Sequence, residues 1–189
     1  MSTHEDRLPP LAPERWDEAQ AIAAQEVVDG PRKGLIAPFV PLLRSPELMT
    51  HAQRMGEYLR YRSALTLRLS ELVILINARL WNQPVEWAIH APIAAQAGLA
   101  LTVIEAIEAG RLPEDMAEDE WAVYGFSMEL HQNKAVSDPT WAKAVALFGE
   151  KGVVDLIGLN GYYSFLAMTM NACRTAVPAG MTAVLPPLG

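Results

Sequence analysis

The stretch that decides the fold runs from Glu71 to Gly98 and reads ELVILINARLWNQPVEWAIHAPIAAQAG. Its first part belongs to a helical pattern that begins near Thr66, in which apolar residues recur three or four positions apart. Pro84 suits the first turn of a second helix, and Gly98 suits its carboxyl-terminal cap. The stretch therefore predicts two consecutive apolar helices joined by a short turn.

The same signals predict helices along most of the chain, and no segment alternates in the manner of a strand. Proline and glycine make residues 1–12 an extended arm, residues 31–45 an irregular apolar loop and residues 176–189 an irregular tail. The expected helices cover residues 13–29, 45–60, 66–80, 84–98, 101–108, 119–132, 139–148 and 152–173. The sequence thus predicts an all-α protein of one domain.

Composition excludes several classes of function. The formal net charge is -7 and the basic residues are scattered, so we expect no nucleic-acid partner. The N-terminus lacks the apolar core of a signal peptide, and Asp155 and Asn160 interrupt the longest apolar run. We therefore expect a cytoplasmic protein with no membrane partner. The single cysteine, Cys173, excludes an internal disulfide and any CxxC motif.

Glu86 and His90 are the most probable functional pair in the sequence. Four positions separate them, so on a helix they lie within hydrogen-bond reach among apolar neighbours. A carboxylate that orients an imidazole is a common acid–base arrangement near neutral pH. A structural alternative stays open, in which Glu86 caps the helix that begins at Pro84 and His90 is a core histidine.

Glu71 is a further acid among apolar residues, on the preceding predicted helix. Arg68 and Arg79 are its nearest basic neighbours along the chain. An ion pair with one of them, within the chain or between subunits, is the structural alternative to a catalytic role.

At this point the chain resembles the carboxymuconolactone decarboxylase family, which belongs to the alkylhydroperoxidase D-like superfamily. The resemblance extends over most of residues 25–175, and the Glu-x-x-x-His segment is its most specific part. The residues that carry it are Gly30-Pro31, Ala37-Pro38-Phe39, Glu71, Ala78-Arg79-Leu80-Trp81, Glu86-Trp87, His90, Ala94, Gly98, Phe148-Gly149-Glu150, Val153-Val154-Asp155-Leu156 and Gly161-Tyr162-Tyr163.

The resemblance implies a helical bundle that assembles into trimers or hexamers, with clefts between subunits. It divides the chain into an N-terminal arm and helix (1–30), the family-like helical domain (31–175) and the tail (176–189). The long N-terminal extension departs from dedicated decarboxylases, which implies a remodelled pocket and leaves the substrate open.

The peroxidase branch of the superfamily uses two cysteines together with the acid at Glu71 and the histidine at His90. The cysteine positions correspond to Gln83 and Glu86 here. Without those thiols, the chain is not expected to run a cysteine-based peroxide cycle. Cys173 lies on another predicted helix, where a small buried apolar role suits it.

The decarboxylase branch has a glutamate four residues before its histidine, as Glu86 precedes His90. The resemblance then implies that His90 donates a proton during loss of carbon dioxide from a carboxylated lactone of aromatic catabolism. Glu86 would orient His90, Glu71 would assist, and Arg79 or Arg32 would hold a substrate carboxylate. We further expect contacts to substrate from Phe39, Trp87, His131 and Tyr162. Structural alternatives stay open for two of them: His131 suits the carboxyl end of its helix, and Tyr162 suits core packing.

The sequence therefore predicts an acid–base enzyme, a lyase or else an isomerase or lactone hydrolase, acting on a small carboxylated or lactone-like molecule. We expect no cofactor and no metal, since an acid–histidine pair without HExxH is weak evidence for a metal site. Two alternatives stay open: a non-catalytic oligomeric ligand-binding protein, and a protein called a peroxidase through superfamily membership alone.

Overall fold

Helix α4 (Leu67–Leu80) lies at the centre of the molecule and packs against α5, α7 and α8. The computed structural model describes residues 5–181 and 185–186. Every residue of α4 from Leu69 to Arg79 is buried, as expected of a helix that is apolar nearly all round. The side chain of Thr66 caps its first turn by accepting a hydrogen bond from the Leu69 amide. Any polar side chain on α4 must therefore find its partners inside the protein.

Helix α5 (Pro84–Gln96) follows α4 after a short turn, which confirms the helix pair predicted from the sequence. Pro84 opens the helix, and the Gln83 side chain caps it by accepting from the Val85 amide at 2.7 Å. Gly98 ends it with a φ of 95°, and the Leu99 amide donates to the Ala94 carbonyl. The turn and the cap fix the direction of α5 relative to α4.

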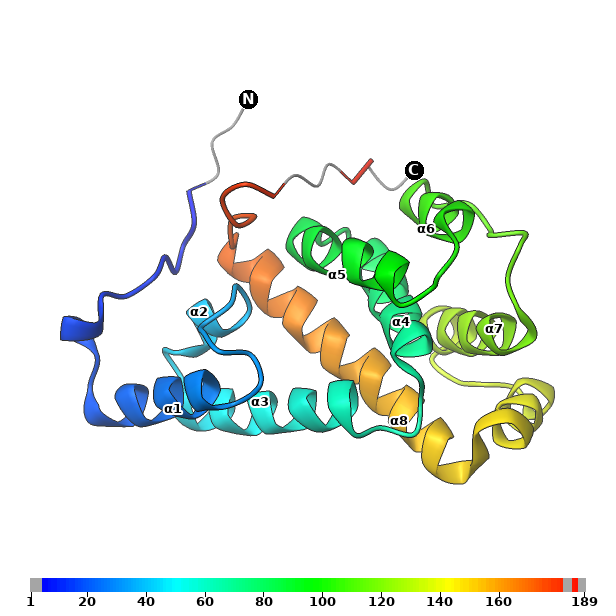
Figure 1. Ribbon diagram of the computed structural model, residues 1–189, viewed down its shortest axis with the longest axis horizontal. Helices are drawn as coiled ribbons and strands as arrows, with labels where there is room; N and C mark the ends of the chain where they lie inside the picture. The colour runs from blue at the N-terminus through cyan, green and yellow to red at the C-terminus, as the bar shows by residue number, and fades with distance from the viewer. Residues whose placement is uncertain (1–4, 182–184, 187–189) are drawn as a thin grey trace.

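Helix α8 (Asp138–Cys173) is the longest helix and packs against α3, α4 and α7. Gly149 breaks its regularity with a φ of 67° and a ψ of 171°, and the bend is visible in Figure 1. The two helices expected over residues 139–148 and 152–173 are the two arms of this bent helix. The longer arm packs against α4 and supplies one wall of the site described below, through Tyr162, Tyr163 and Leu166.

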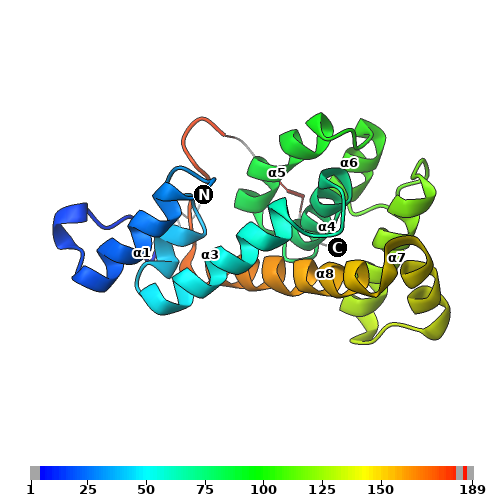
Figure 2. The ribbon, with the colours of Figure 1, turned by 60° about the horizontal axis from the view of Figure 1, so that its bottom comes forward.

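The N-terminal segments form one end of the molecule, as Figures 1 and 2 show. They comprise a short 3-10 helix (Pro13–Arg15), α1 (Glu18–Asp29), α2 (Phe39–Leu42) and α3 (Pro46–Tyr61), with α1 packed on α3. Pro13 begins a helical turn as expected, but that turn ends at Arg15, and the capping box of Asp17 and Gln20 begins α1 separately at Glu18. This end covers the site from one side.

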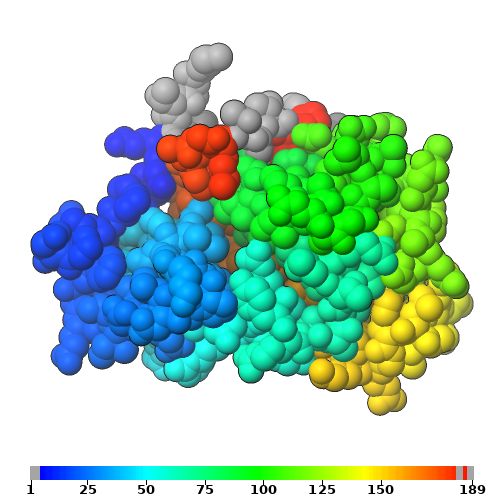
Figure 3. All heavy atoms as spheres, in the orientation of Figure 1, coloured from blue at the N-terminus to red at the C-terminus, as the bar shows by residue number. Residues whose placement is uncertain are grey.

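Helices α6 (Leu101–Glu108) and α7 (Glu118–Asn133) lie at the other end of the molecule (Figures 1 and 3), where α7 packs against α8 and α6 against α4 and α5. Arg68 joins the start of α4 to the start of α7 through ion pairs with Asp119, at 2.6 Å, and Glu120. The alternative in which Arg68 pairs with Glu71 is therefore wrong.

Across the residues that the structure describes, the chain forms a single-domain, all-α bundle of eight α-helices without strands. None of the helices in this part is long and apolar enough to cross a membrane. The arm runs back to the end of α8, where the Arg7 amide donates to the Cys173 carbonyl at 2.8 Å. The expectations for residues 1–4, 182–184 and 187–189 lie outside the described residues.

Candidate active site

Glu71 and His90 form the strongest polar contact of the site. Glu71 comes from the buried centre of α4 and His90 from the middle of α5, and the Glu71 Oε2 atom lies 2.7 Å from His90 Nδ1. An ionised Glu71 accepts a hydrogen bond from Nδ1–H, and this selects the tautomer whose free lone pair is on Nε2. Glu71 therefore orients the ring and leaves Nε2 as the atom that exchanges protons.

Glu86 approaches the same ring from the other side. Its Oε2 atom lies 3.3 Å from His90 Nε2, one helical turn away on α5. Gln83 supplies the side-chain cap of this helix, and Glu86 Oε1 has no hydrogen-bond partner. Glu86 is thus directed at the imidazole rather than at the helix end, as the functional interpretation of the pair requires.

Burial raises the pKa of Glu86, an effect that the nearby His90 opposes and the Glu71 carboxylate reinforces. A carboxyl group with a raised pKa keeps its proton closer to neutral pH. One proton can then be shared between Glu86 and His90 Nε2, while Nδ1–H donates to Glu71. The three side chains thus form a chain in which a proton moves along Glu86 and Nε2 without a change of net charge.

The ring of His90 faces a small cavity of about 20 Å³ between α3, α5, α8 and the loop that precedes α2. A space of this size holds about one water molecule. Three of the predicted contact residues, Arg32, Phe39 and Tyr162, lie in its wall together with Glu86 and His90. The remaining lining residues are Ile36, Pro38, Arg60, Ile89, Tyr163 and Leu166.

Two tyrosines of α8 pack edge-on beside the histidine. The Tyr163 ring centre lies 5.4 Å from that of His90, and the two tyrosine ring centres are 5.2 Å apart. Burial raises the pKa of Tyr162 to about 12, so its hydroxyl stays protonated and can donate. That hydroxyl is buried without a hydrogen-bond partner, and it lies against Gly56 of α3, where a Cβ would come within 2.2 Å of it.

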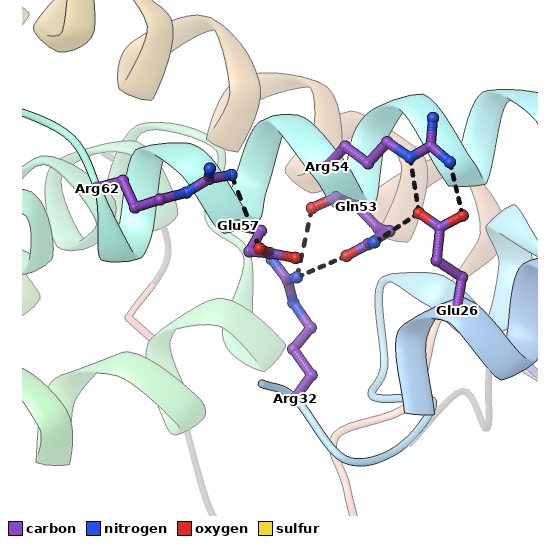
Figure 4. A network of polar contacts seen from close by, with 6 residues as sticks. All are labelled: Glu26, Arg32, Gln53, Arg54, Glu57 and Arg62. Carbon is purple, nitrogen blue, oxygen red and sulfur yellow. Dashed lines mark hydrogen bonds and ion pairs between the residues drawn. The ribbon is translucent and has the colours of Figure 1, made fainter. Parts of the chain in front are cut away.

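Arg32 belongs to the loop that closes the cavity. Its guanidinium lies 5.0 Å from the centre of the Phe39 ring and donates to the Gln53 side chain at 3.2 Å. Gln53 in turn donates to Glu26 of α1 at 2.9 Å, and Glu26 forms a two-point ion pair with Arg54 (Figure 4). These hydrogen bonds and ion pairs connect the loop that carries Arg32 to α1 and α3, and Arg32 lies in the wall of the cavity.

Arg60 is the basic residue of the cavity that the sequence analysis did not identify. It lies in the last turn of α3, half-buried, and its Nε atom has no hydrogen-bond partner. The helix itself was predicted, but no local pattern indicates that its last turn meets α5 and α8. Arg32 and Arg60 together give the cavity two cationic groups.

Three predicted substrate contacts lie elsewhere. Arg79 is on another side of α4 in a separate cavity, and Trp87 is packed in the hydrophobic core. His131 has its Nε2 atom 3.1 Å from Asn160 Oδ1, within a buried amide and hydroxyl network that includes Ser127. The structure therefore does not bring these three to His90, and it leaves Glu71 paired with His90 rather than with Arg79.

Cys173 lies at the end of α8 and does not line the cavity of His90. Burial and the negative charge of Asp6 raise the pKa of its thiol, which makes it a poor nucleophile near neutral pH. Among residues 5–181 and 185–186, no group of three or more histidine, cysteine or acidic side chains is arranged to hold a metal ion.

Comparison of the sequence with models of protein families and with curated proteins found no match. The resemblance to the carboxymuconolactone decarboxylase family therefore stays a prediction from the residues quoted above.

Proposed function

We propose that this protein is a cofactor-free acid–base enzyme that acts on a small carboxylated or lactone-like molecule, as the resemblance to carboxymuconolactone decarboxylases implies. The observation that carries the proposal is the arrangement of His90, with Nδ1 hydrogen-bonded to Glu71 and Nε2 beside Glu86 at a cavity with two arginines. In this arrangement Glu86 can supply a proton, His90 Nε2 can transfer it to a substrate, and the two arginines can bind an anionic group of that substrate.

Decarboxylation is the reaction that suits these groups best. The bond between the substrate carbon and its carboxylate breaks, carbon dioxide leaves, and the electron pair stays on the carbon, delocalised into the neighbouring unsaturated system. The shared proton moves from Glu86 to His90 Nε2, and Nε2–H then donates it to that carbon, which leaves Glu86 ionised and the imidazole neutral until a water molecule returns a proton to Glu86. Glu71 holds the ring throughout and stabilises its charged form.

Arg32, Arg60 and Tyr162 are the groups we assign to binding the substrate acid or the lactone carbonyl. A guanidinium offers two parallel donors to a carboxylate, and Arg60 Nε has no hydrogen-bond partner among residues 5–181 and 185–186. Tyr162 offers a neutral hydroxyl donor. Because the cavity is about 20 Å³, substrate entry requires the loop that carries Arg32 to move outward.

The proposal is tested by measuring carbon dioxide release from a panel of carboxylated lactones and related unsaturated ring-cleavage acids. We expect turnover by the wild type and a loss of about 100-fold or more in kcat in His90→Ala and in Glu86→Gln. His51→Ala, on the exposed side of α3, is the control and should keep full activity.

Circular dichroism should show unchanged helical content in all three variants. If the His90 and Glu86 variants unfold, the pair is structural and the proposal fails. If the wild type binds acids of the panel but converts none, the protein is a ligand-binding member of the same fold instead.

We also propose that the protein forms a homotrimer or homohexamer. Helix α8 exposes Val154, Ile157 and Met168 by 62, 41 and 45%, and these residues recur at helical spacing along one stripe. An apolar stripe on a long helix suits contact with a second copy of the chain.

A further inference from the structure

A second cavity, remote from His90, lies between α4, α6 and α7. Its volume is about 110 Å³, and it shares no lining residue with the cavity of His90. Its walls are mostly apolar, from Ile76, Leu80, Ile107 and Met128, while Arg79 and Arg111 supply the charges. A cationic group that lines an apolar cavity is unfavourable unless an anion or hydrogen-bond acceptors compensate its charge.

Arg79 is buried without an acidic partner. Its exposed fraction is only 6%, and among the described residues no carboxylate lies within 4.0 Å of its guanidinium. One donor reaches Asn82 Oδ1 at 3.0 Å, while Nε has no hydrogen-bond partner. A buried guanidinium with a neutral partner and an unused donor is costly, and an anion in the cavity would offset that cost.

The backbone at Gly110 lies close to the Arg79 guanidinium, on one side of the cavity. Gly110 follows α6 with a φ of 69°, and a Cβ at this position would lie 3.2 Å from the Arg79 Nη2 atom. Arg111, next in the chain, is exposed and lines the same cavity. Arg79 is thus buried in the wall of the cavity, and Arg111 is exposed at its edge. Their positive charges favour a ligand with an anionic group.

We propose that this cavity is a binding site for a small aliphatic carboxylate, with Arg79 holding the carboxylate and the apolar wall holding the chain. Cavities of about 150 Å³ accept benzene, so a space somewhat smaller suits a carboxylate with a chain of roughly three to five carbons. The site does not depend on the proton-transfer function, because the two cavities have separate walls.

Isothermal titration calorimetry with sodium butyrate tests this site, and butyramide is the uncharged probe of the same shape. Butyrate should bind saturably to the wild type, with one molecule in the Arg79 cavity of each chain. Butyramide should bind to this cavity about 10-fold more weakly or worse. Arg79→Gln should weaken butyrate binding by about 10-fold or more. Arg62→Gln, which changes an exposed arginine at the end of α3, is the control and should leave this binding unchanged.

Because Arg79→Gln alters a buried residue, Met128→Trp provides a second variant. It fills the cavity from its half-buried wall and keeps the guanidinium, so it should also abolish butyrate binding. The proposal is overturned if butyramide binds as tightly as butyrate, if Arg79→Gln leaves butyrate binding unchanged, or if no saturable binding occurs. It is also overturned if Arg79→Gln lowers the oligomer mass, since an acid of a second copy would then pair with Arg79.

Discussion

His90 has both ring nitrogens beside carboxylates, and the two carboxylates differ in role. Glu71 accepts a short hydrogen bond at 2.7 Å, whereas Glu86 lies 3.3 Å from the ring; among the described residues, the second oxygen of each carboxylate has no hydrogen-bond partner. Burial of a carboxylate whose oxygens lack hydrogen-bond donors disfavours the charged form of Glu86. The pKa of Glu86 is therefore raised, and this side chain keeps its proton to a higher pH than an ordinary glutamate.

Replacing Glu86 by Gln should raise stability increasingly as pH rises. The folded protein keeps the Glu86 proton above the ordinary pKa of 4.5, whereas the unfolded chain releases it, so this group's contribution to stability is lost as pH rises through the folded pKa. The melting temperature of Glu86→Gln relative to wild type should grow between about pH 5 and about pH 8. Glu47→Gln, at an exposed first-turn acid of α3, is the control. A difference that stays constant with pH would contradict the assignment.

Gly56 is required by the close approach of Tyr162. A Cβ at this position would lie 2.2 Å from the Tyr162 hydroxyl and 2.7 Å from Arg32 Nη2, so Gly56→Ala should displace the tyrosine. We expect a loss of about 1–3 kcal/mol in unfolding free energy from overpacking, measured by urea denaturation. Gly125→Ala, in open space on α7, should cause no loss. Equal effects in both variants would count against the packing at Tyr162.

At the scale of helices, the bend of α8 depends on one residue. Gly149 combines a φ of 67° with a ψ of 171°, a conformation that L side chains rarely adopt, and no atom would contact a Cβ there. Gly149→Ala should therefore cost about 1–3 kcal/mol through backbone strain alone. Gly161→Ala, in a regular part of the same helix, should instead stabilise by about 0.5–1 kcal/mol. Thermal unfolding of both variants checks this contrast.

The helices were predictable from local signals because proline, glycine and side-chain caps mark their ends. Pro84 and Gly98 bound α5 as expected, whereas the start of α1 was misplaced because the Asp17–Gln20 capping box outweighs a proline at Pro13. Gly149 also marks the boundary between the two helices that were expected in place of α8.

The site was predictable only where its contacts are local. The Glu86–His90 contact follows from helical spacing, but the Glu71–His90 bond joins two helices, and it was suggested by family resemblance alone. Arg79 was misassigned because α4 is buried on all sides. Glu71 and Arg79 are eight positions apart on it, which rotates them by roughly 80° toward different neighbours. Arg60 was missed because its position depends on how α3 meets α5 and α8.

At the scale of the whole molecule, the exposed stripe on α8 predicts self-association. Light scattering should give a mass that is three or six times the 20.7 kDa of one chain, and Ile157→Asp should shift the mass toward the monomer. Ile22→Asp places the same charge on α1, where Ile22 is 65% exposed, and should leave the mass unchanged. A monomeric wild type would contradict the proposed assembly.

The central claim is that Glu71 fixes the His90 ring so that Nε2 alone exchanges protons. Nitrogen-15 NMR of the histidine side chains, with His90 assigned through His90→Ala, measures the protonation of each ring nitrogen directly. We predict that the neutral ring carries its proton on Nδ1, which donates to Glu71, and has its lone pair on Nε2. A neutral ring with its proton on Nε2 and its lone pair on Nδ1 would contradict the account.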